Sequence, residues 1–313
     1  MTSRPIVVGT DGSEESLRAV GWAAREAARR TAPLRVVSVP PGRASAASRD
    51  GTPETVDDLL RGMYAESLRT AAQRAGDTAP AVAIESELLP GIPWRALAGE
   101  SSRASMLVVG ASGIGGYGEV GLGRVSGYLA RHARCPLVVV RDDQGRPLSD
   151  EIVVGVRDAD EATAALRFAF EEAVVRGARL LAVHCWHWFP PARLLSPGKQ
   201  YAPGSHAGLR RLDAMQPAAA RLDVLDAQAL SEDAGARLAE ALNRWQDKYP
   251  EVQVSQHVVH GHPGRVLASL TSSAGLVVLA RHEGHGRIRP GSGLIQAAVL
   301  NHAKGPVAVI PSA

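Results

Sequence analysis

The sequence is short of cysteine, aromatic residues and lysine, and each shortage narrows the class of protein. The chain of 313 residues has 2 cysteines; Cys135 and Cys185 lie in or beside apolar runs, which favours buried thiols over a disulfide framework. Aromatic residues make up only 4%, so the core should be aliphatic. Lys199, Lys248 and Lys304 are the only lysines, and the formal net charge of +3 is too small to indicate a polyanion partner.

Long hydrophobic runs are also missing. No apolar run approaches the roughly 18–20 residues that span a bilayer, and the chain enters a strand at residues 6–8, which leaves no room for a secretory leader. These two absences predict a cytoplasmic protein that does not enter membranes. The chain does have 45% apolar residues, enough for a substantial core and, at this length, for about two domains.

The chain repeats itself. IVVGTDGSEES at residues 6–16 recurs as IVVGVRDADEA at 152–162, and HARCPLVVV at 132–140 recurs as HAKGPVAVI at 302–310. The offset between the copies grows from 146 to 170 residues, so the second copy carries 24 extra residues (170 − 146). They fall within 187–230, a proline-rich stretch that predicts a surface excursion.

Each copy alternates strands and helices, and we expect two domains, at residues 1–145 and 150–313. In the first, the expected strands lie near 4–10, 34–39, 82–88, 105–110 and 136–141, and the expected helices near 13–30, 53–75, 93–103 and 124–133. Continuous apolar strands that alternate with helices indicate a parallel sheet covered on both faces. The predicted fold class is therefore α/β, with two tandem open parallel five-stranded sheets and helices on both faces.

A glycine-rich loop follows the fourth expected strand. Residues 110–123, GASGIGGYGEVGLG, contain seven glycines between an apolar run and the helix expected from Arg124 onward. Glycines bring backbone N–H groups close to an anion, and a helix N-terminus adds unpaired donors, so the arrangement favours a phosphate site over a flexible linker. Ligands of open parallel sheets bind beyond the C-terminal ends of the strands, where the turn at residues 10–13 should join the loop in one crevice.

Four separated segments, present in order in both copies, resemble the universal stress protein family. Gly110, Gly113 and Gly123 match the family's G-x2-G-x9-G spacing, VGTDGS at 8–13 resembles its opening, and 123–140 resembles the segment that leads into its last strand. The resemblance implies a Rossmann-like, adenine nucleotide alpha hydrolase-like fold. It also implies a nucleotide site in the first domain, with Asp11 near the ribose, the backbone of Val39 at the adenine and the loop at the phosphates. The residues implied to bind the ligand are Gly9, Asp11, Val39, Gly110, Gly113, Gly123, Arg124 and Val125.

The same resemblance implies a non-catalytic regulator of the stress response. Its ligand would be ATP or another adenine nucleotide, with Mg²⁺ as a candidate companion of the phosphates, and its regulatory protein partner is not identified by the sequence. No P-loop or kinase signature is present, so any ATP hydrolysis should be slow and incidental. Family members dimerise through the last strand, so residues 136–141 and 306–311 would pair either within a monomer or across a homodimer.

Two departures from the family pattern bear on the site. Arg124 stands where the family has Ser or Thr, so it either binds phosphate through its guanidinium or points to solvent, and both interpretations stay open. The second copy departs further, because Arg157 replaces the counterpart of Asp11. At the remaining motif positions of that copy stand Ala280, Glu283, Gly293 and Leu294. A carboxylate at position 283 would repel phosphate, so we expect the second site to be degenerate.

Other interpretations compete with nucleotide binding. One is a nucleotide-free scaffold of the same fold. Another is a metal or anion site in the second domain, on His184, Cys185, His187, His260, His262, His282, Glu283 and His285. These residues lack the His-Glu-x-x-His and Cys-x-x-Cys spacings of metal sites. Nucleic-acid binding through Arg281, Arg287 and Arg289 is disfavoured because no binding module is recognised. The G-x-G-x-x-G matches in the loop follow the fourth strand instead of the first, which disfavours a dinucleotide site.

Overall fold

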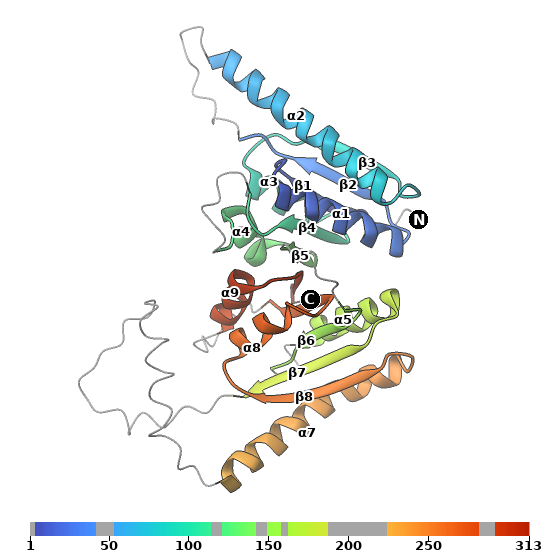
Figure 1. Ribbon diagram of the computed structural model, residues 1–313, viewed down its shortest axis with the longest axis vertical. Helices are drawn as coiled ribbons and strands as arrows, with labels where there is room; N and C mark the ends of the chain where they lie inside the picture. The colour runs from blue at the N-terminus through green and yellow to red at the C-terminus, as the bar shows by residue number, and fades with distance from the viewer. Residues whose placement is uncertain are drawn as a thin grey trace, which may run out of the picture.

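The computed structural model describes residues 4–41, 53–113, 121–141, 149–157, 162–186, 224–281 and 292–312 (Figure 1). In its first half, strands and helices alternate as the sequence predicts. The strands are β1 (Ile6–Thr10), β2 (Leu34–Ser38), β3 (Ile84–Leu88), β4 (Met106–Gly110) and β5 (Leu137–Val140). The helices are α1 (Glu14–Arg29), α2 (Pro53–Thr78), α3 (Pro93–Glu100) and α4 (Arg124–His132).

The second half repeats this order. Its strands are β6 (Ile152–Gly155), β7 (Leu180–Trp186), β8 (Val254–His260), β9 (Leu276–Ala280) and β10 (Val307–Ile310). Its helices are α5 (Thr163–Arg176), α7 (Val224–Lys248), α8 (Pro263–Leu270) and α9 (Ser292–His302). Most of the predicted excursion, residues 187–223, lies outside the described residues.

The described strands form one ten-stranded sheet in the order β3-β2-β1-β4-β5-β10-β9-β6-β7-β8. Neighbouring strands within each half are parallel. The halves join where β5 and β10 pair antiparallel, with Val138 opposite Ala308. The predicted fold class is confirmed, and the two five-stranded sheets are continuous through this pair. Each last strand therefore covers the edge of the other within the same chain.

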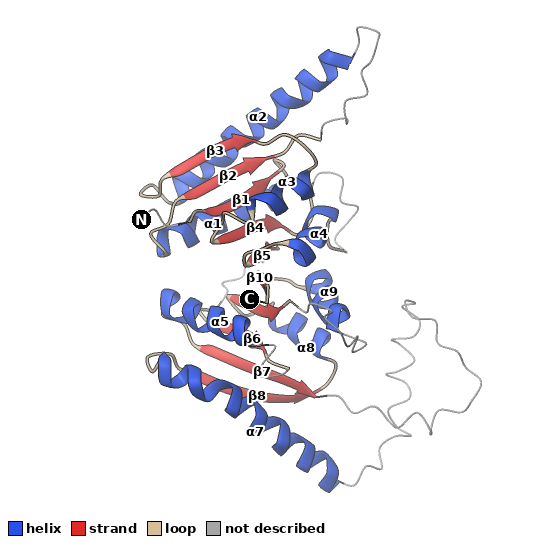
Figure 2. Ribbon diagram, turned by 180° about the vertical axis from the view of Figure 1, so that it is seen from behind, coloured by secondary structure: helices blue, strands red, loops and turns tan. Residues whose placement is uncertain are grey.

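Helices cover both faces of the sheet (Figure 2). Helices α1, α2, α5 and α7 pack over one face, and α3, α4, α8 and α9 pack over the other. Successive residues of a buried strand point to opposite faces; Ile6 accordingly belongs to the first core and Val7 to the second. On β5, Val138 and Val139 divide in the same way, so both cores run through the junction of the two halves.

A cluster of ion pairs, called here the Glu–Arg cluster, links α1 to α5. Its members are Glu26, Arg30, Glu172 and Arg176. The Glu26 carboxylate accepts hydrogen bonds from Arg30 Nε and Arg176 Nη2, each at 2.7 Å. The Glu172 carboxylate accepts one from Arg176 Nε at 2.8 Å. Arg30 also pairs with Glu172, and both glutamate side chains are 0% exposed. Each residue lies 146 positions from its counterpart (172 − 26 and 176 − 30), which is the offset of the sequence repeat.

Burial raises the pKa of each of the two glutamates, and the neighbouring guanidiniums lower it. Burial raises the pKa of Glu26, but the guanidiniums of Arg176 and Arg30 outweigh it, and the net pKa lies below its ordinary value. Burial and the nearby charge of Glu26 raise the pKa of Glu172. The pair therefore titrates in two steps, and Glu26 is the carboxylate that stays ionised to lower pH.

Candidate functional site

A short turn between β1 and α1 holds Asp11. Ser13 caps α1 by accepting a hydrogen bond from the Ser16 N–H at 3.3 Å, and Asp11 Oδ1 accepts one from the Ser13 N–H at 3.0 Å. The buried hydroxyls of Thr10 and Ser16 lie 2.9 Å apart. Gly12 has a φ of +85°, a conformation that favours glycine. The turn is thus fixed by its own side chains, and one carboxylate oxygen of Asp11 takes part in fixing it.

The start of the glycine-rich loop packs directly against this turn. A Cβ at Gly113 would lie 2.2 Å from Asp11 Oδ2, and a Cβ at Gly110 would lie 3.1 Å from the backbone of Glu15 and Ser16. A side chain at Gly110 would push the loop away from the backbone of α1, and one at Gly113 would displace the Asp11 carboxylate. Asp11 and the start of the loop are therefore in contact. Close packing explains why both positions are glycine, in addition to the expected ligand.

Glu15 ties the same loop to α1. Its Oε2 atom accepts hydrogen bonds from the Ser112 N–H at 2.7 Å and from the Ser112 hydroxyl at 2.5 Å. Hydrogen bonds to an ionised carboxylate are roughly twice as strong as neutral ones. The family resemblance does not point to Glu15, and the only signal for it in the sequence is its place in the first turn of a helix beside the loop.

The loop closes on itself where α4 begins. Gly123 caps α4, and its N–H donates to the Ala111 carbonyl at 2.8 Å. A Cβ at Gly123 would lie 3.0 Å from that same oxygen, so this glycine is also closely packed. The buried Ser126 hydroxyl donates to the Gly110 carbonyl at 2.7 Å. The Ser126 hydroxyl therefore stabilises the start of the loop at Gly110 and is not directed to a ligand.

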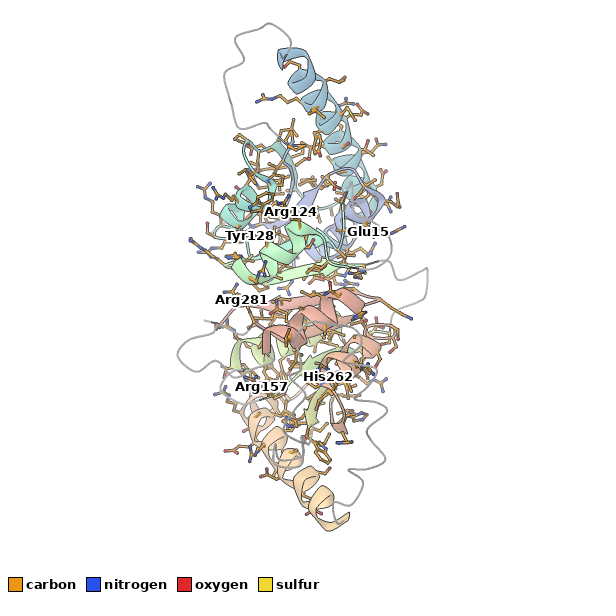
Figure 3. The ribbon with its side chains drawn as sticks, turned by 90° about the vertical axis from the view of Figure 1, so that its left-hand side faces the viewer. Glu15, Arg124, Tyr128, Arg157, His262 and Arg281 are labelled. Atoms are coloured by element: carbon orange, nitrogen blue, oxygen red, sulfur yellow. The ribbon has the colours of Figure 1, made fainter. Side chains whose placement is uncertain are left out.

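Arg124 and Val125 open α4, where backbone N–H groups have no partner within the helix. The exposed Arg124 side chain lies over the Trp94 ring of α3, with Cζ 5.1 Å from the ring centroid. Tyr128, on the same helix (Figure 3), lies 6.5 Å from Trp94 and stacks on His132 at 4.0 Å between centroids. The guanidinium is thus held by an aromatic surface, a contact worth about 0.5–1 kcal/mol at an exposed site.

Val39 and Gly9, the remaining residues expected to bind the ligand, lie on adjacent strands. Val39 follows β2 and is 5% exposed. The Ser38 hydroxyl donates to the Thr10 carbonyl at 2.7 Å, which holds the ends of β2 and β1 together. Gly9 lies within β1, where a Cβ would come 3.0 Å from Leu97 of α3. Val39 is therefore next to the β1 turn, and Gly9 allows α3 to approach the sheet.

Helix α2 contributes to the surroundings of Asp11. A Cβ at Gly12 would lie 2.5 Å from the Ser67 hydroxyl. Burial, and after it the negative charge of Asp11, raises the pKa of Tyr64. Tyr64 and Ser67 are therefore neighbours of the turn on a helix to which the resemblance assigns no ligand residue.

The corresponding region of the second half has a different chemistry. Arg157 stands where the first half has Asp11 (Figure 3), and Ala280 stands where it has Gly110. Residues 158–161, which correspond to the turn and helix start at 12–15 of the first half, lie outside the described residues.

The expected histidine group of the second half is only partly described. His184 Nδ1 lies 2.9 Å from the Val156 carbonyl oxygen, and burial lowers the pKa of His184. His260 packs against Trp186, with ring centroids 4.5 Å apart. Across the described ranges, no three His, Cys, Asp or Glu side chains gather closely enough to hold a metal ion. Outside those ranges lie His187, His282, Glu283, His285, Arg287 and Arg289.

Both cysteines are free thiols, as their isolation in the sequence predicts. Burial raises the pKa of Cys135 to about 12 and that of Cys185 to about 11. Thiols with such values are protonated at neutral pH and therefore poor nucleophiles. Among the helices that the structure describes, none combines the length and apolar character needed to cross a bilayer.

Comparison with known proteins finds relatives along the whole chain. The sequence model of the universal stress protein family matches residues 2–141 and 149–311. A universal stress protein of Mycobacterium tuberculosis is 33% identical over 311 residues, which covers 97% of this chain and 96% of that protein. A second one from the same organism is 32% identical over 325 residues, covering 98% and 95%. The fold is similar to the crystal structure of a universal stress protein from Archaeoglobus fulgidus, with a TM-score of 0.64, 16% identity and 99% of each chain covered.

Proposed function

The chain belongs to the universal stress protein family, and from this we propose that its first domain (residues 1–145) binds ATP, or another adenine nucleotide, in the cytoplasm. The observation that carries the proposal is the contact between Gly113 and Asp11, where a Cβ would lie 2.2 Å from the carboxylate. A ribose acceptor and a phosphate loop must reach the same nucleotide, and this contact supports a single site. The protein then acts as a non-catalytic regulator, because occupancy changes the loop surface that a regulatory protein meets.

Each element of the proposed site supplies one kind of contact. Asp11 accepts hydrogen bonds from the ribose hydroxyls, and the backbone at Val39 meets the adenine. Gly110, Gly113 and Gly123 bring the two described ends of the loop to the phosphates, and the first N–H groups of α4, at Arg124 and Val125, donate to them. Residues 114–120 of the loop lie outside the described residues. Helix α4 has 9 residues, long enough for its N-terminal dipole to favour an anion. The second domain (residues 150–313) lacks the ribose acceptor, and we propose that it binds nucleotide poorly or not at all.

The charges around the proposed site favour a cation that accompanies the nucleotide. Asp11 and Glu15 bring two carboxylates to the loop, and both repel a triphosphate. Mg²⁺ bound to the phosphates lowers this repulsion, and carboxylate oxygens are among the ligands it prefers. Since the described residues gather no group of three such ligands, we propose that Mg²⁺ enters as part of the nucleotide complex and is not a resident ion.

Arg124 provides a mobile positive charge in this proposal. Its Cζ lies 5.1 Å from the Trp94 ring centroid, directly after the Gly123 cap of α4. A guanidinium–phosphate pair with two hydrogen bonds is stronger than an exposed cation–π contact of about 0.5–1 kcal/mol. We therefore propose that Arg124 exchanges Trp94 for a phosphate when the nucleotide binds, and that it replaces the hydroxyl donor found there in other family members.

Isothermal titration calorimetry with Mg-ATP tests the nucleotide site. Asp11→Ala should weaken binding by about 10- to 150-fold, because a hydrogen bond to a charged group contributes about 1.5–3 kcal/mol. Arg157→Ala, at the equivalent position of the second domain, is the matched control and should leave the affinity unchanged. No binding of Mg-ATP by the wild type, or equal affinity in Asp11→Ala, contradicts the proposal.

A nucleotide-free scaffold is the competing function. It is favoured by the contact of Glu15 with Ser112, because a carboxylate already accepts the hydrogen bond of a loop N–H at 2.7 Å. Heat denaturation of the purified protein, followed by chromatography of the supernatant, separates the two functions. Release of an adenine nucleotide supports the nucleotide site. Incubation of the native protein with Mg-ATP should yield ADP at most slowly, and rapid steady turnover would contradict a non-catalytic role.

A further inference from the structure

The C-terminal end of the glycine-rich loop is held by the second domain. The Leu122 N–H donates to the Asn301 carboxamide oxygen on α9 at 2.9 Å. Arg141, which follows β5, donates from Nη2 to the Gly121 carbonyl and to the Leu300 carbonyl, both at 3.0 Å. Gly121 and Leu122 belong to the loop, whereas Leu300 and Asn301 form the last turn of α9. Two hydrogen-bonded routes therefore lead from the loop into the second domain.

These contacts lie immediately before the cap of α4. Gly123 follows Leu122 directly, caps the helix and donates to the Ala111 carbonyl at 2.8 Å. Since this bond closes the loop, a shift of Leu122 would move the closing pair and the first N–H groups of α4 with it. The contacts made by α9 therefore bear on the part of the loop proposed to meet phosphate.

Arg141 also interacts electrostatically with Glu15, the residue of α1 that binds the start of the loop. Burial lowers the pKa of Arg141, and the nearby negative charge of Glu15 acts in the opposite direction. Glu15 in turn accepts two hydrogen bonds from Ser112 near the start of the loop. Glu15 and Arg141 therefore hydrogen-bond to opposite ends of the loop, Glu15 to Ser112 and Arg141 to Gly121.

We propose that Asn301 and Arg141 are positioning residues of the nucleotide site, so that the second domain sets the nucleotide affinity of the first. This inference rests on the proposed function. Coupling between two sites is reciprocal, so nucleotide bound in the first domain stabilises the contacts with α9 by the same factor. The second domain thereby has a role that needs no ligand of its own, because it holds the loop of its partner.

Other hydrogen bonds between the domains do not involve the loop, and they provide a control for the effect of Asn301. Gln296, also on α9, donates from Nε2 to the Ala130 carbonyl at 3.1 Å. Arg281, which lies between the two halves (Figure 3), donates to the Ala133 carbonyl. Both acceptors lie at the C-terminal end of α4, at the opposite end from the Gly123 cap. Gln296→Ala therefore removes a hydrogen bond between the domains, from the same helix, without touching the loop.

The test compares the binding of Mg-ATP and of adenosine by calorimetry, using the full chain. Asn301→Ala should weaken Mg-ATP binding by about 2- to 12-fold, the range for one neutral hydrogen bond, and adenosine binding by less than about 2-fold, because the contact bears on the phosphates. Gln296→Ala should change neither affinity. Asn301→Asp keeps an acceptor for the Leu122 N–H and should therefore retain slow exchange of that amide, whereas its added negative charge repels the phosphates of Mg-ATP.

Hydrogen exchange at the Leu122 amide provides a second measurement on the same proteins. Exchange should be faster in Asn301→Ala than in the wild type and unchanged in Gln296→Ala. Arg141→Met removes both carbonyl contacts and takes the place of Asn301→Ala if that variant does not fold. Failure of the wild type to bind Mg-ATP overturns the proposed function and this inference together. Binding by the wild type that Asn301→Ala or Arg141→Met weakens no more than Gln296→Ala does overturns the inference alone.

Discussion

Replacing Glu26 with alanine should strongly destabilise the protein, because it removes one carboxylate from the buried Glu–Arg cluster. Glu26 is 0% exposed and accepts hydrogen bonds from Arg30 and Arg176, each at 2.7 Å. The variant would leave both guanidiniums with Glu172 as their remaining carboxylate in the cluster. Since Arg176 comes from α5, the loss acts on the pairing of the two halves as well as on α1.

The expected loss in the free energy of unfolding is about 3–5 kcal/mol, the range for removing one partner of a buried ion pair. Two short hydrogen bonds to a charged group, at about 1.5–3 kcal/mol each, give the same order of magnitude. A third partner of Glu26, Arg29, contributes little to the free energy of unfolding, because its Nη1 lies 3.5 Å from the carboxylate and its side chain is 41% exposed.

Urea denaturation followed by tryptophan fluorescence measures this loss. Trp22 reports on the cluster, because Arg176 lies 5.3 Å from its ring centroid. Glu14→Ala is the matched control on the same helix; the Glu14 side chain is 62% exposed and lies 3.9 Å from Arg18, so its removal should cost less than about 1 kcal/mol. The reasoning is refuted if Glu26→Ala lowers the free energy of unfolding no more than Glu14→Ala does. In that case the ion pairs would only offset the cost of burying their charges.

The stability difference between the wild type and Glu26→Ala should also depend on pH. Burial raises the pKa of Glu26 in the folded protein, but Arg176 and Arg30 bring it below its ordinary value of 4.5. A lowered folded pKa contributes stability that is fully present above the unfolded pKa and is lost as the pH falls through the folded pKa. In a Glu172→Gln background, which removes the second titrating carboxylate of the cluster, the difference should therefore be constant at neutral pH and shrink below about pH 4.5. A difference that grows on acidification contradicts this assignment.

Three other variants or probes test the loop, the aromatic contact and the buried thiol. Gly113→Ala should lower both the melting temperature and the nucleotide affinity, because its Cβ would lie 2.2 Å from the Asp11 carboxylate; wild-type values for both would contradict the observed packing. Arg124→Ala should keep the stability within about 1 kcal/mol of the wild type but alter the fluorescence of Trp94, and Mg-ATP should change the wild-type spectrum more than that of the variant. Cys135, whose pKa burial raises to about 12, should resist alkylation in the native protein and react after denaturation, so rapid labelling of the native chain would argue against its burial.

The elements of the fold could be predicted because their sequence signals are local. Apolar runs predicted the strands, and the helix-like stretches that alternate with them predicted the helices, including α1, which was expected near residues 13–30. The boundaries differ by a few residues: the helix expected to end near 75 continues to Thr78, and the one expected to end near 103 ends at Glu100. Helix ends are the least determined part of such a prediction, since the last turn depends on partners outside it.

The candidate site could be predicted only where it follows a motif. The family spacing identified the three motif glycines, and the structure brings Gly110, Gly113 and Gly123 together with Asp11. Asn301 was missed because an asparagine near a helix end is an ordinary surface residue in the sequence. Glu26 was missed as well, although applying the offset of 146 to charged residues would have paired it with Glu172.

By itself the sequence determined the repeated order of strands and helices, the aliphatic core and the position of the loop after the fourth strand, because periodicity, apolar burial and turn chemistry act over a few neighbouring residues. Only the tertiary structure decided that β5 and β10, whose pairing the resemblance implied, pair within one chain, that Arg124 lies on Trp94, and that α9 contacts the loop. The contact between Leu122 and Asn301 spans 179 positions, and that between Glu26 and Arg176 spans 150. Such contacts depend on how separate elements meet in space, which a local pattern does not encode.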